Sequence, residues 1–321
     1  MNQAEWENFL TSHPEANFLQ SWQWGELHSR LGDTVVRRRT WQGIVKDARR
    51  GRYLEIPGGP LIDWTDHDTV SSVFDEIRRI ALEQRCVFVR IRPQVLNSDD
   101  ITRRLHGEGL RKSPMHLHAE HTNILSLEQG ESDILTGMRR QTRYEVRRAL
   151  KLDMQVTWSN DDRAFDEFFE VQRQTAKRQG FIPPSHTFLH ALRESFGDNT
   201  RIYRVEHKGI LRNLALVLWS GTEADYLEAA STPESRSVPG AYALQWQSIR
   251  DAKQAGLSRY NFWGIAYTDD PHHRYAGVTT FKRGFGGNDT TYIAAHDLVL
   301  HRGRYMLNLI VETARKKKRK L

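Results

Sequence analysis

The sequence is poor in cysteine and in long apolar runs, and each absence excludes a class of protein. Cys86 is the single cysteine, so an internal disulfide and a multi-cysteine zinc site are both excluded. The longest apolar run, Leu214–Trp219, is far shorter than the roughly 20 residues that cross a bilayer. The first residues, MNQAEWENFL, have neither the basic nor the apolar segment of a signal peptide. We therefore expect a cytoplasmic protein.

General motifs for catalysis and cofactor binding are also missing. The chain has no Walker loop, no Gly-x-Gly-x-x-Gly after a predicted strand, no Gly-x-Ser-x-Gly and no His-Glu-x-x-His. In a strand, His116, His118 and Glu120 would share one face as a possible ligand set, but a polar strand end explains them better. The histidine pair at 272–273 lies beside Asp269 and Asp270 in a predicted loop, and a metal site is again the less favoured interpretation. We expect neither a metal nor a cofactor.

The composition is that of a folded α/β protein. The 321 residues are 38% hydrophobic and 27% charged, which is enough apolar content for one large domain or two ordinary ones. Apolar residues at helical spacing predict helices over 66–84, 161–178 and 241–255. Predicted strands alternate with them, including a meander over 200–229. A meander, a helix and a strand occur on either side of about residue 150, which favours two α/β domains of similar plan.

The net charge of +7 is concentrated in two segments. The run 315–320 consists of six basic residues, and 139–151 has six basic residues and one acid. A helix is predicted from Ser132 through the second segment. Three of its arginines share one stripe of that helix: Arg140, Arg143 and Arg147. The two segments predict two contacts with anions or, as the alternative, a solvated helix face and a frayed tail.

Two further segments place basic residues beside glycines. GVTTFKRGFGG at 277–287 has Lys282 and Arg283 among four glycines. Glycines permit close approach of a backbone to a ligand, and the basic pair supplies charge, so we expect a site role here. TAKRQGF at 175–181 ends a predicted helix, where Arg178 either binds a ligand or satisfies the last carbonyls.

Eight short segments form an ordered pattern along nearly the whole chain. They are FLQSWQWGEL (18–27), YLEIPGGPLID (53–63), VFVRIRP (87–93), HAEHTNILSL (118–127), TRYEVRRALK (142–151), TAKRQGF (175–181), YNFWGI (260–265) and GVTTFKRGFGG (277–287) followed by HDLVL. Each is weak alone, but eight in this order resemble the FemABX family of peptidoglycan-bridge aminoacyltransferases.

The resemblance implies an α/β fold of two tandem GNAT-like (acyl-CoA N-acyltransferase-like) domains, without the coiled-coil arm that some members carry. The last helix is expected to return to the first domain, so the expected domains are 1–150 with 301–321, and 151–300. The implied activity transfers an amino acid from aminoacyl-tRNA to the stem-peptide amine of a UDP-linked or lipid-linked peptidoglycan precursor. We expect a monomer. No cofactor should be needed, because the ester donor is already activated.

The resemblance also implies roles for particular residues. Lys282 is expected to stabilise the charge that develops during transfer, and Phe281 to stack on the tRNA end. Arg178 is expected to bind the precursor's diphosphate or a peptide carboxylate, and Tyr226 to line the peptide channel. The other expected substrate contacts are Trp24, Arg283, and either His28 or Arg30. The sequence shows no obvious general base.

The basic segments are expected to contact tRNA phosphates or the anionic inner face of the membrane. The candidates in the tail are Lys316, Lys317 and Lys318. Contact with the membrane would make the protein peripheral to the inner leaflet.

Two other functions stay open on sequence grounds. An acyl-CoA-dependent N-acyltransferase would need a glycine-rich pyrophosphate loop, and the nearest segment, 236–246, lacks the glycine pair. A non-enzymatic nucleic-acid-binding protein would explain the basic segments but would leave 277–287 without a role.

Overall fold

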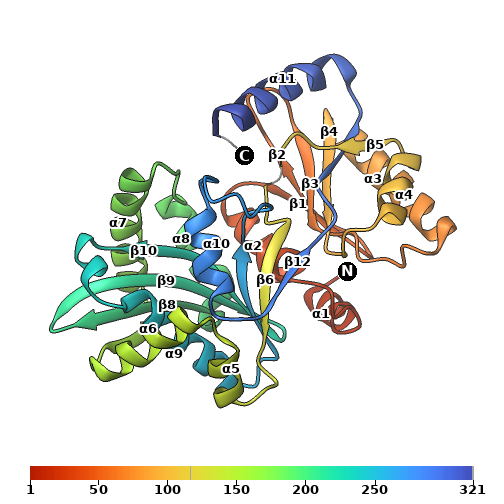
Figure 1. The fold of residues 1–321 in the computed structure, drawn as a ribbon. Coiled ribbons are helices and arrows are strands. Elements are labelled where there is room, and N and C mark those ends of the chain that lie inside the picture. The colour runs from red at the N-terminus through yellow and green to blue at the C-terminus, as the bar shows by residue number, and fades with distance from the viewer. Residues whose placement is uncertain (116, 320–321) are drawn as a thin grey trace. The chain divides into compact units, whose positions relative to one another are not determined.

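The computed structural model describes residues 1–115 and 117–319, with side chains as far as Lys316. It consists of two compact units, 1–120 with 291–321, and 121–290 (Figure 1). These boundaries differ from the expected ones, because residues 121–150 belong to the second unit and 291–300 to the first. His116, one of the possible ligands in the polar strand end, lies outside the described residues.

A six-stranded sheet in the order β1-β2-β3-β4-β13-β5 forms the centre of the first unit. β3 and β4 are parallel, and the other neighbours are antiparallel. β13 pairs with β4 from His296 opposite Ile91 to Val299 opposite Phe88, which is why 291–300 joins this unit. The strands are β1 (Thr34–Arg37), β2 (Gln42–Lys46), β3 (Tyr53–Gly58), β4 (Phe88–Pro93), β5 (Leu110–Lys112) and β13 (His296–Val299).

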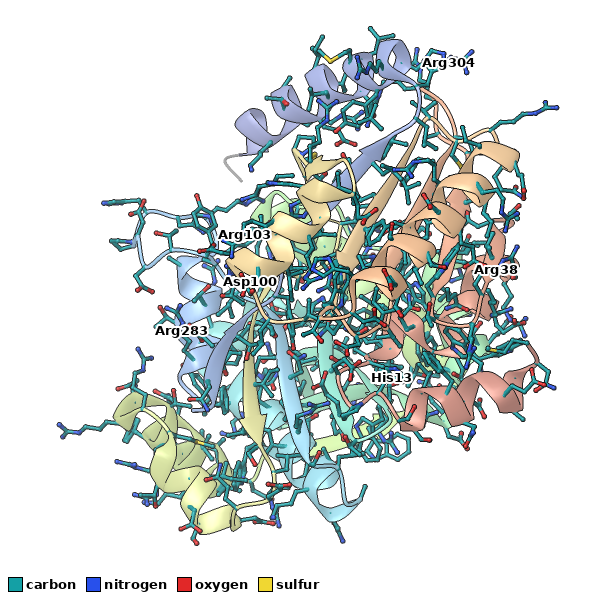
Figure 2. The ribbon with its side chains drawn as sticks, turned by 90° about the vertical axis from the view of Figure 1, so that its right-hand side faces the viewer. His13, Arg38, Asp100, Arg103, Arg283 and Arg304 are labelled. Carbon is teal, nitrogen blue, oxygen red and sulfur yellow. The ribbon has the colours of Figure 1, made fainter. Side chains whose placement is uncertain are left out.

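Helix α3 (His67–Glu83) connects the parallel strands β3 and β4, and it confirms the helix predicted over 66–84. Asp66 caps its first turn, and Phe74 and Ile77 are among the residues that it buries against the sheet. Surface ion pairs one turn apart support the helices of this unit, such as Arg103 with Asp100 on α4 (Figure 2). The other helices of the first unit, apart from the C-terminal one, are α1 (Gln3–Thr11), the 3₁₀ turn Phe18–Gln20, α2 (Trp22–Arg30) and α4 (Asp99–Gly107).

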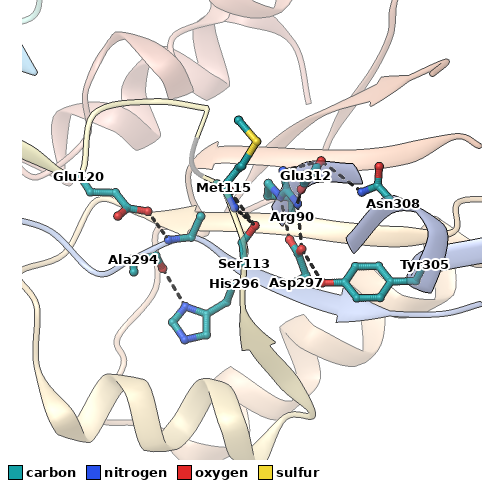
Figure 3. A network of polar contacts seen from close by, with 11 residues as sticks. Arg90, Ser113, Met115, Glu120, Ala294, His296, Asp297, Tyr305, Asn308 and Glu312 are labelled. Carbon is teal, nitrogen blue, oxygen red and sulfur yellow. Dashed lines mark hydrogen bonds and ion pairs between the residues drawn. The ribbon is translucent and has the colours of Figure 1, made fainter. Parts of the chain in front are cut away.

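A buried ionic network fastens the last helix, α11 (Arg302–Arg319), to the first unit (Figure 3). Arg90 on β4 forms two hydrogen bonds of 2.8 Å with Asp297 on β13 and another of 2.8 Å with Glu312 on α11. The Tyr305 hydroxyl donates to Asp297 at 2.8 Å. Burial alone would lower the pKa of Arg90, but its bonds to the two carboxylates outweigh that effect and raise it.

The second unit is built on a seven-stranded sheet in the order β12-β6-β11-β10-β9-β8-β7. β6 pairs with β11 (Arg259 opposite Ser126), so the segment after residue 120 is bound to strands far along the chain. β10 and β11 are parallel, β8–β10 form the predicted meander, and β7 pairs with β8 at the edge of the sheet. The strands are β6 (His121–Ser126), β7 (Gln155–Ser159), β8 (Thr200–His207), β9 (Ile210–Ser220), β10 (Glu223–Ser231), β11 (Arg259–Gly264) and β12 (Asn288–Thr291).

Helices cover both faces of this sheet, with α7 and α8 on one side and α6 and α9 on the other (Figure 1). Aromatic and aliphatic side chains of β8–β11 pack against α9 through Leu244 and Ile249. The helices are α5 (Glu131–Gly137), α6 (Arg140–Lys151), α7 (Asp162–Gln179), α8 (His186–Phe196), α9 (Gly240–Gln254) and α10 (Ala276–Arg283), with 3₁₀ turns at Gly197–Asn199 and Pro233–Ser237.

The predicted continuous helix from Ser132 is wrong, because the structure has two helices, α5 and α6. The chain is extended at Met138, whose side chain is buried in the core, and Arg139 N–H donates to the Gly284 carbonyl at 2.9 Å. A tertiary contact therefore ends α5 before the basic segment.

The longest helices of the described residues, α7 and α11, have 18 residues each. In that part of the chain, none combines the length and apolar content that a membrane crossing requires.

Candidate functional site

A pocket of ≈ 250 Å³ lies in the second unit where β10 and β11 separate. The two parallel strands pair over Glu223–Asp225 and Arg259–Asn261, and β10 then continues to Ser231 along the pocket. Strand β9 and helices α7, α9 and α10 supply its other walls. The lining residues are Thr175, Gln179, Asn213, Leu214, Tyr226, Ala229, Ala230, Ser231, Ala241, Leu244, Gly277, Val278 and Phe281.

An irregularity in β10 directs a carboxylate toward α7. Tyr226 lies opposite Val217 on β9, but Glu228 lies opposite the adjacent Leu216, so Leu227 is the extra residue of a β-bulge. Side chains alternate along a strand, so the bulge turns Glu228 to the face opposite Tyr226. There, Gln172 on α7 donates a hydrogen bond of 2.7 Å to the Glu228 carboxylate.

Lys282 is the buried cation of this region. It lies in the last turn of α10, and its side chain is almost fully enclosed. Its ammonium donates to the Gly264 carbonyl at the end of β11 at 2.7 Å and lies 5.5 Å from the centre of the Tyr226 ring. The lysine is therefore held by a backbone dipole and an aromatic face, while Glu228 acts on it through space.

The pKa values of these two groups are displaced toward each other. Burial disfavours the ammonium and lowers the pKa of Lys282 to about 8, although the negative charge of Glu228 opposes the change. Burial also raises the pKa of Glu228 to about 7, against the opposing effects of Lys282 and Gln172. Near neutral pH this acid–base pair can exchange protons with a bound amine, as acid–base catalysis requires.

Two of the aromatic residues predicted for the site, Tyr226 and Phe281, line its pocket. Tyr226 is buried, and burial raises the pKa of its hydroxyl to about 12, so it remains a neutral phenol. Phe281 precedes Lys282 on α10 and packs in edge-to-face geometry with Tyr242 and Phe285, at centroid distances of 5.1 and 5.2 Å. The structure thus brings Tyr226, Phe281 and Lys282 together.

Arg178 lies at the rim of the same pocket. Its guanidinium donates to the Ser231 carbonyl at the end of β10 and to the Thr175 hydroxyl at 3.2 Å. Thr175 and Ser231 both line the pocket. Arg178 therefore connects the end of α7 to the end of β10. In these contacts it does not cap the last carbonyls of its own helix.

Arg283, labelled in Figure 2, pairs with two carboxylates. Its guanidinium forms ion pairs of 2.5 Å with Asp269 and 2.6 Å with Asp289. Hydrogen bonds to Asp289 and Asp269 raise the pKa of Arg283. These contacts assign Arg283 a role in fixing the loops around α10, and the structure adds nothing in favour of its predicted substrate contact.

The glycines after Lys282 serve the fold rather than a ligand. A Cβ at Gly284 would lie 2.3 Å from the Thr142 hydroxyl on α6, and one at Gly287 would lie 2.5 Å from the Ile124 carbonyl on β6. Gly287 also has a φ of 83°, which favours glycine. Close approach of the backbone to a ligand was expected here; at Gly284 and Gly287 the structure shows close approach to other parts of the protein.

The basic helix α6 presents part of its predicted stripe to solvent. Arg140 and Arg147 are exposed, as is Lys151. Arg143 is different, because its guanidinium donates at 2.7 Å to the Thr136 carbonyl of α5 and so supports the break between the two helices.

In the first unit, Trp24 and His28 are buried on α2 and Arg30 is exposed. His28 Nδ1 lies 2.8 Å from the Asp33 carboxylate and 2.9 Å from the Lys46 ammonium, and its ring meets Trp24 at 4.9 Å. Burial, together with the charge of Lys46, lowers the pKa of His28. His28 is thus engaged within its own unit, and Lys46 on β2 is a cation that sequence analysis missed.

Lys316 is exposed on α11, while the side chains of Lys317 and Lys318 lie outside the described residues.

Sequence analysis also missed Glu228 and Gln172. A glutamate inside the apolar strand sequence EADYLEAAS was the available signal, but the bulge that redirects it depends on the pairing with β9.

Comparison with known proteins defines the class first. The structure superposes on FemX with a TM-score of 0.84 at 18% identity, over 96% of this chain and 98% of that one. A tandem GNAT protein from the clavulanic acid biosynthesis pathway matches with a TM-score of 0.50 at 12% identity, over 83% and 82% of the two chains. The fold is therefore the predicted tandem GNAT-like fold.

The sequence then identifies the family. A model of the FemAB family matches residues 1–113 and 204–313, so the chain belongs to the FemAB family, as its resemblance indicated. It is also 21% identical to the lipid II:glycine glycyltransferase of Staphylococcus haemolyticus (strain JCSC1435), over 94% of this chain and 93% of that protein. That alignment spans 391 positions, more than this chain has residues, so the relative contains insertions.

Proposed function

We propose that this protein is an aminoacyltransferase that moves an amino acid from aminoacyl-tRNA to the stem-peptide amine of a peptidoglycan precursor. Membership of the FemAB family and likeness to a lipid II:glycine glycyltransferase support the peptidoglycan acceptor. The observation that carries the chemistry is buried Lys282, with the half-buried Glu228 carboxylate near it, beside a pocket along the end of β10. The proposal of aminoacyl-tRNA as donor rests on the family resemblance.

The pair accounts for the proton that the reaction must move. The acceptor ammonium gives a proton to Glu228, and the free amine attacks the ester carbonyl carbon. A tetrahedral oxyanion forms and is stabilised by the positive charge of Lys282 in a site with little water. The ester C–O bond then breaks as the carbonyl re-forms, and the leaving ribose oxygen takes the proton back from Glu228. The attacking nitrogen still carries one proton more than an amide does, and it loses that proton to the freed Glu228 carboxylate and from there to solvent. No oxidant, reductant or nucleoside triphosphate is required.

The pocket supports this assignment by its size and lining. Its volume of ≈ 250 Å³ is below the roughly 300–1,000 Å³ of sites for drug-sized ligands, so it accommodates an aminoacyl group or a peptide end. Small residues such as Ala229, Ala230 and Gly277 form much of its wall, and Phe281 offers a ring for stacking. Arg178, at the rim, is our candidate for binding an anionic group of the precursor.

The exposed arginines of α6 are candidate contacts for tRNA phosphates. Arg140 and Arg147 would contribute a salt-dependent term without sequence selectivity. An acyl-CoA donor finds less support. In the segment nearest to a pyrophosphate loop, Gly240 packs closely against Asn213: a Cβ at Gly240 would lie 2.4 Å from the Asn213 side-chain oxygen, so the fold accounts for this glycine.

The test is a transfer assay with purified protein, radiolabelled alanyl-, seryl- or glycyl-tRNA, and either UDP-linked or lipid-linked precursor. We expect precursor-dependent release of free tRNA and a precursor heavier by one or more amino acids in mass spectrometry. The choice among donors and precursors defines the substrate. Transfer from acyl-CoA, or retention of tRNA without transfer, would contradict the proposal. Muropeptide analysis after deletion of the gene extends the test to the cell.

A further inference from the structure

Helices α7 and α8 belong to the second unit (Figure 1). A cluster of histidines and aspartates, none of which lines the pocket, joins these two helices. α7 presents Asp162 and Asp166, which are one helical turn apart, and α8 presents His186 and His190 with the same spacing. Residues four apart lie on one face of a helix, so each pair faces the other across the contact between the helices. The mechanism proposed above uses none of these four residues.

Three of the side chains converge on one point. His186 Nε2 lies 2.8 Å and His190 Nε2 2.9 Å from the same Asp166 oxygen, Oδ1. One ligand atom from each residue lies within 4.8 Å of the others. Two imidazole nitrogens and a carboxylate oxygen at this spacing match the ligand types of zinc sites, in which metal–ligand distances are about 2.0–2.2 Å.

A further shell of contacts orients one of the rings. The opposite nitrogen of His190, Nδ1, lies 3.3 Å from Asp162 Oδ1, and Arg193 holds the same oxygen at 2.6 Å. Metal-bound histidines commonly have such a carboxylate on the second nitrogen, because it fixes the direction of the first. His186 is positioned by edge-to-face packing on Phe169 at 5.2 Å. Both rings therefore present Nε2 to Asp166.

We propose that Asp166, His186 and His190 bind a divalent transition-metal ion, with Zn²⁺ as the reference ion. The donor set suits Zn²⁺, Ni²⁺ or Cu²⁺ better than Mg²⁺ or Ca²⁺, which prefer oxygen ligands. A fourth position would be open to water, since His186 and Asp166 are more than half exposed. The ion would cross-link α8 to α7, the helix that also carries Gln172 and Arg178 of the candidate site, and so stabilise the second unit.

The experiment measures Zn²⁺ binding to the full chain, prepared without a histidine tag, by competition with a chromophoric chelator. We expect one site per chain. His186→Ala and Asp166→Asn should each weaken binding by at least about 100-fold, and Asp162→Asn by about 10-fold, as expected of a residue that only orients a ligand. His67→Ala, at an exposed histidine of the first unit, is the matched control and should bind as the wild type does.

Two further readouts separate metal binding from a structural role. Co²⁺ should give visible absorption bands in the wild type that are absent in His186→Ala, and Zn²⁺ should raise the melting temperature of the wild type but not of that variant. Circular dichroism without metal shows whether each variant folds. Equal Zn²⁺ affinity in the wild type and His186→Ala, or identical Co²⁺ spectra, would overturn the proposal.

Discussion

Arg90 in the first unit and Lys282 in the second are both buried cations, and their surroundings differ in one respect. Arg90 has two carboxylates in direct contact, each at 2.8 Å, and they raise its pKa despite burial. Lys282 has a backbone carbonyl and an aromatic ring in contact and a carboxylate only at longer range, so burial prevails and lowers its pKa to about 8. The first arrangement locks a helix onto a sheet, whereas the second leaves a group ready to change its protonation state.

The largest effect should come from breaking the Arg90 network. Arg90→Met leaves the buried Asp297 without its counter-charge, so we expect a loss of about 3–5 kcal/mol in the free energy of unfolding. Urea denaturation measures it. The double variant Arg90→Met/Asp297→Asn removes the uncompensated charge and should recover part of the loss. A single variant as stable as the wild type would mean that the network does not hold α11 in place.

Replacing Lys282 by methionine should instead affect the transfer rate and leave the free energy of unfolding equal or higher. Lys282→Met is expected to lower the transfer rate at saturating substrates by about 10²–10³, because one charge donor to the oxyanion is lost. Stability should stay equal or rise, by up to about 3 kcal/mol, since burying the ammonium is unfavourable. Lys151→Met, at an exposed residue, is the control. A wild-type rate in Lys282→Met would show that Lys282 is not catalytic.

The pH profile sharpens the role of Glu228. The proposed mechanism needs Glu228 deprotonated and Lys282 protonated, so the rate should rise as the pH passes about 7 and fall above about 8. These apparent values belong to the pair, because each charge influences the other. Glu228→Gln should lose the rising limb together with most of the rate. Lys282→Met removes the positive charge that favours the carboxylate, so the limb of its residual activity should move to higher pH. An unchanged limb in both variants would exclude Glu228 as the proton acceptor.

Arg178 tests whether a cation at the rim serves the substrate or the fold. Arg178→Lys keeps the charge but loses the planar fork, so we expect precursor binding to weaken about tenfold while aminoacyl-tRNA binding stays unchanged. Isothermal titration with each substrate measures this. Equal weakening of both would indicate that Arg178 acts through the contact between α7 and Ser231.

The smallest effect is expected at the basic tail, beyond the Arg90 network. A chain that ends at Ala314 keeps Tyr305 and Glu312, so its stability should be unchanged. Sedimentation with anionic vesicles should decrease, because each basic residue near an anionic leaflet contributes about 1 kcal/mol. Transfer to a soluble UDP-linked precursor should persist. Lost activity on that precursor would favour tRNA contact instead.

The local sequence determined the family, most helices and part of the site. Periodic apolar residues predicted α3, α7 and α9 because a helix must bury one face. Lys282 was found from the motif 277–287, and Phe281 and Tyr226 were implied by the family resemblance. The structure places Tyr226 and Phe281 in the lining of one pocket and Lys282 beside Tyr226, because α10 and β10 approach each other there. The motif 277–287 was expected to have a site role because of its glycines and charge, but the helix within it, α10, was not predicted.

The tertiary structure decided what depends on residues far apart in the chain. The boundaries of the units follow from the pairing of β6 with β11 and of β13 with β4, which no local pattern encodes. Glu228 enters the site through a bulge that exists only against β9, and His28 is held by Asp33 and Lys46 within its own unit. A side chain's pKa and partners depend on burial and on the charges that the fold places beside it, so they arise only when the chain has folded.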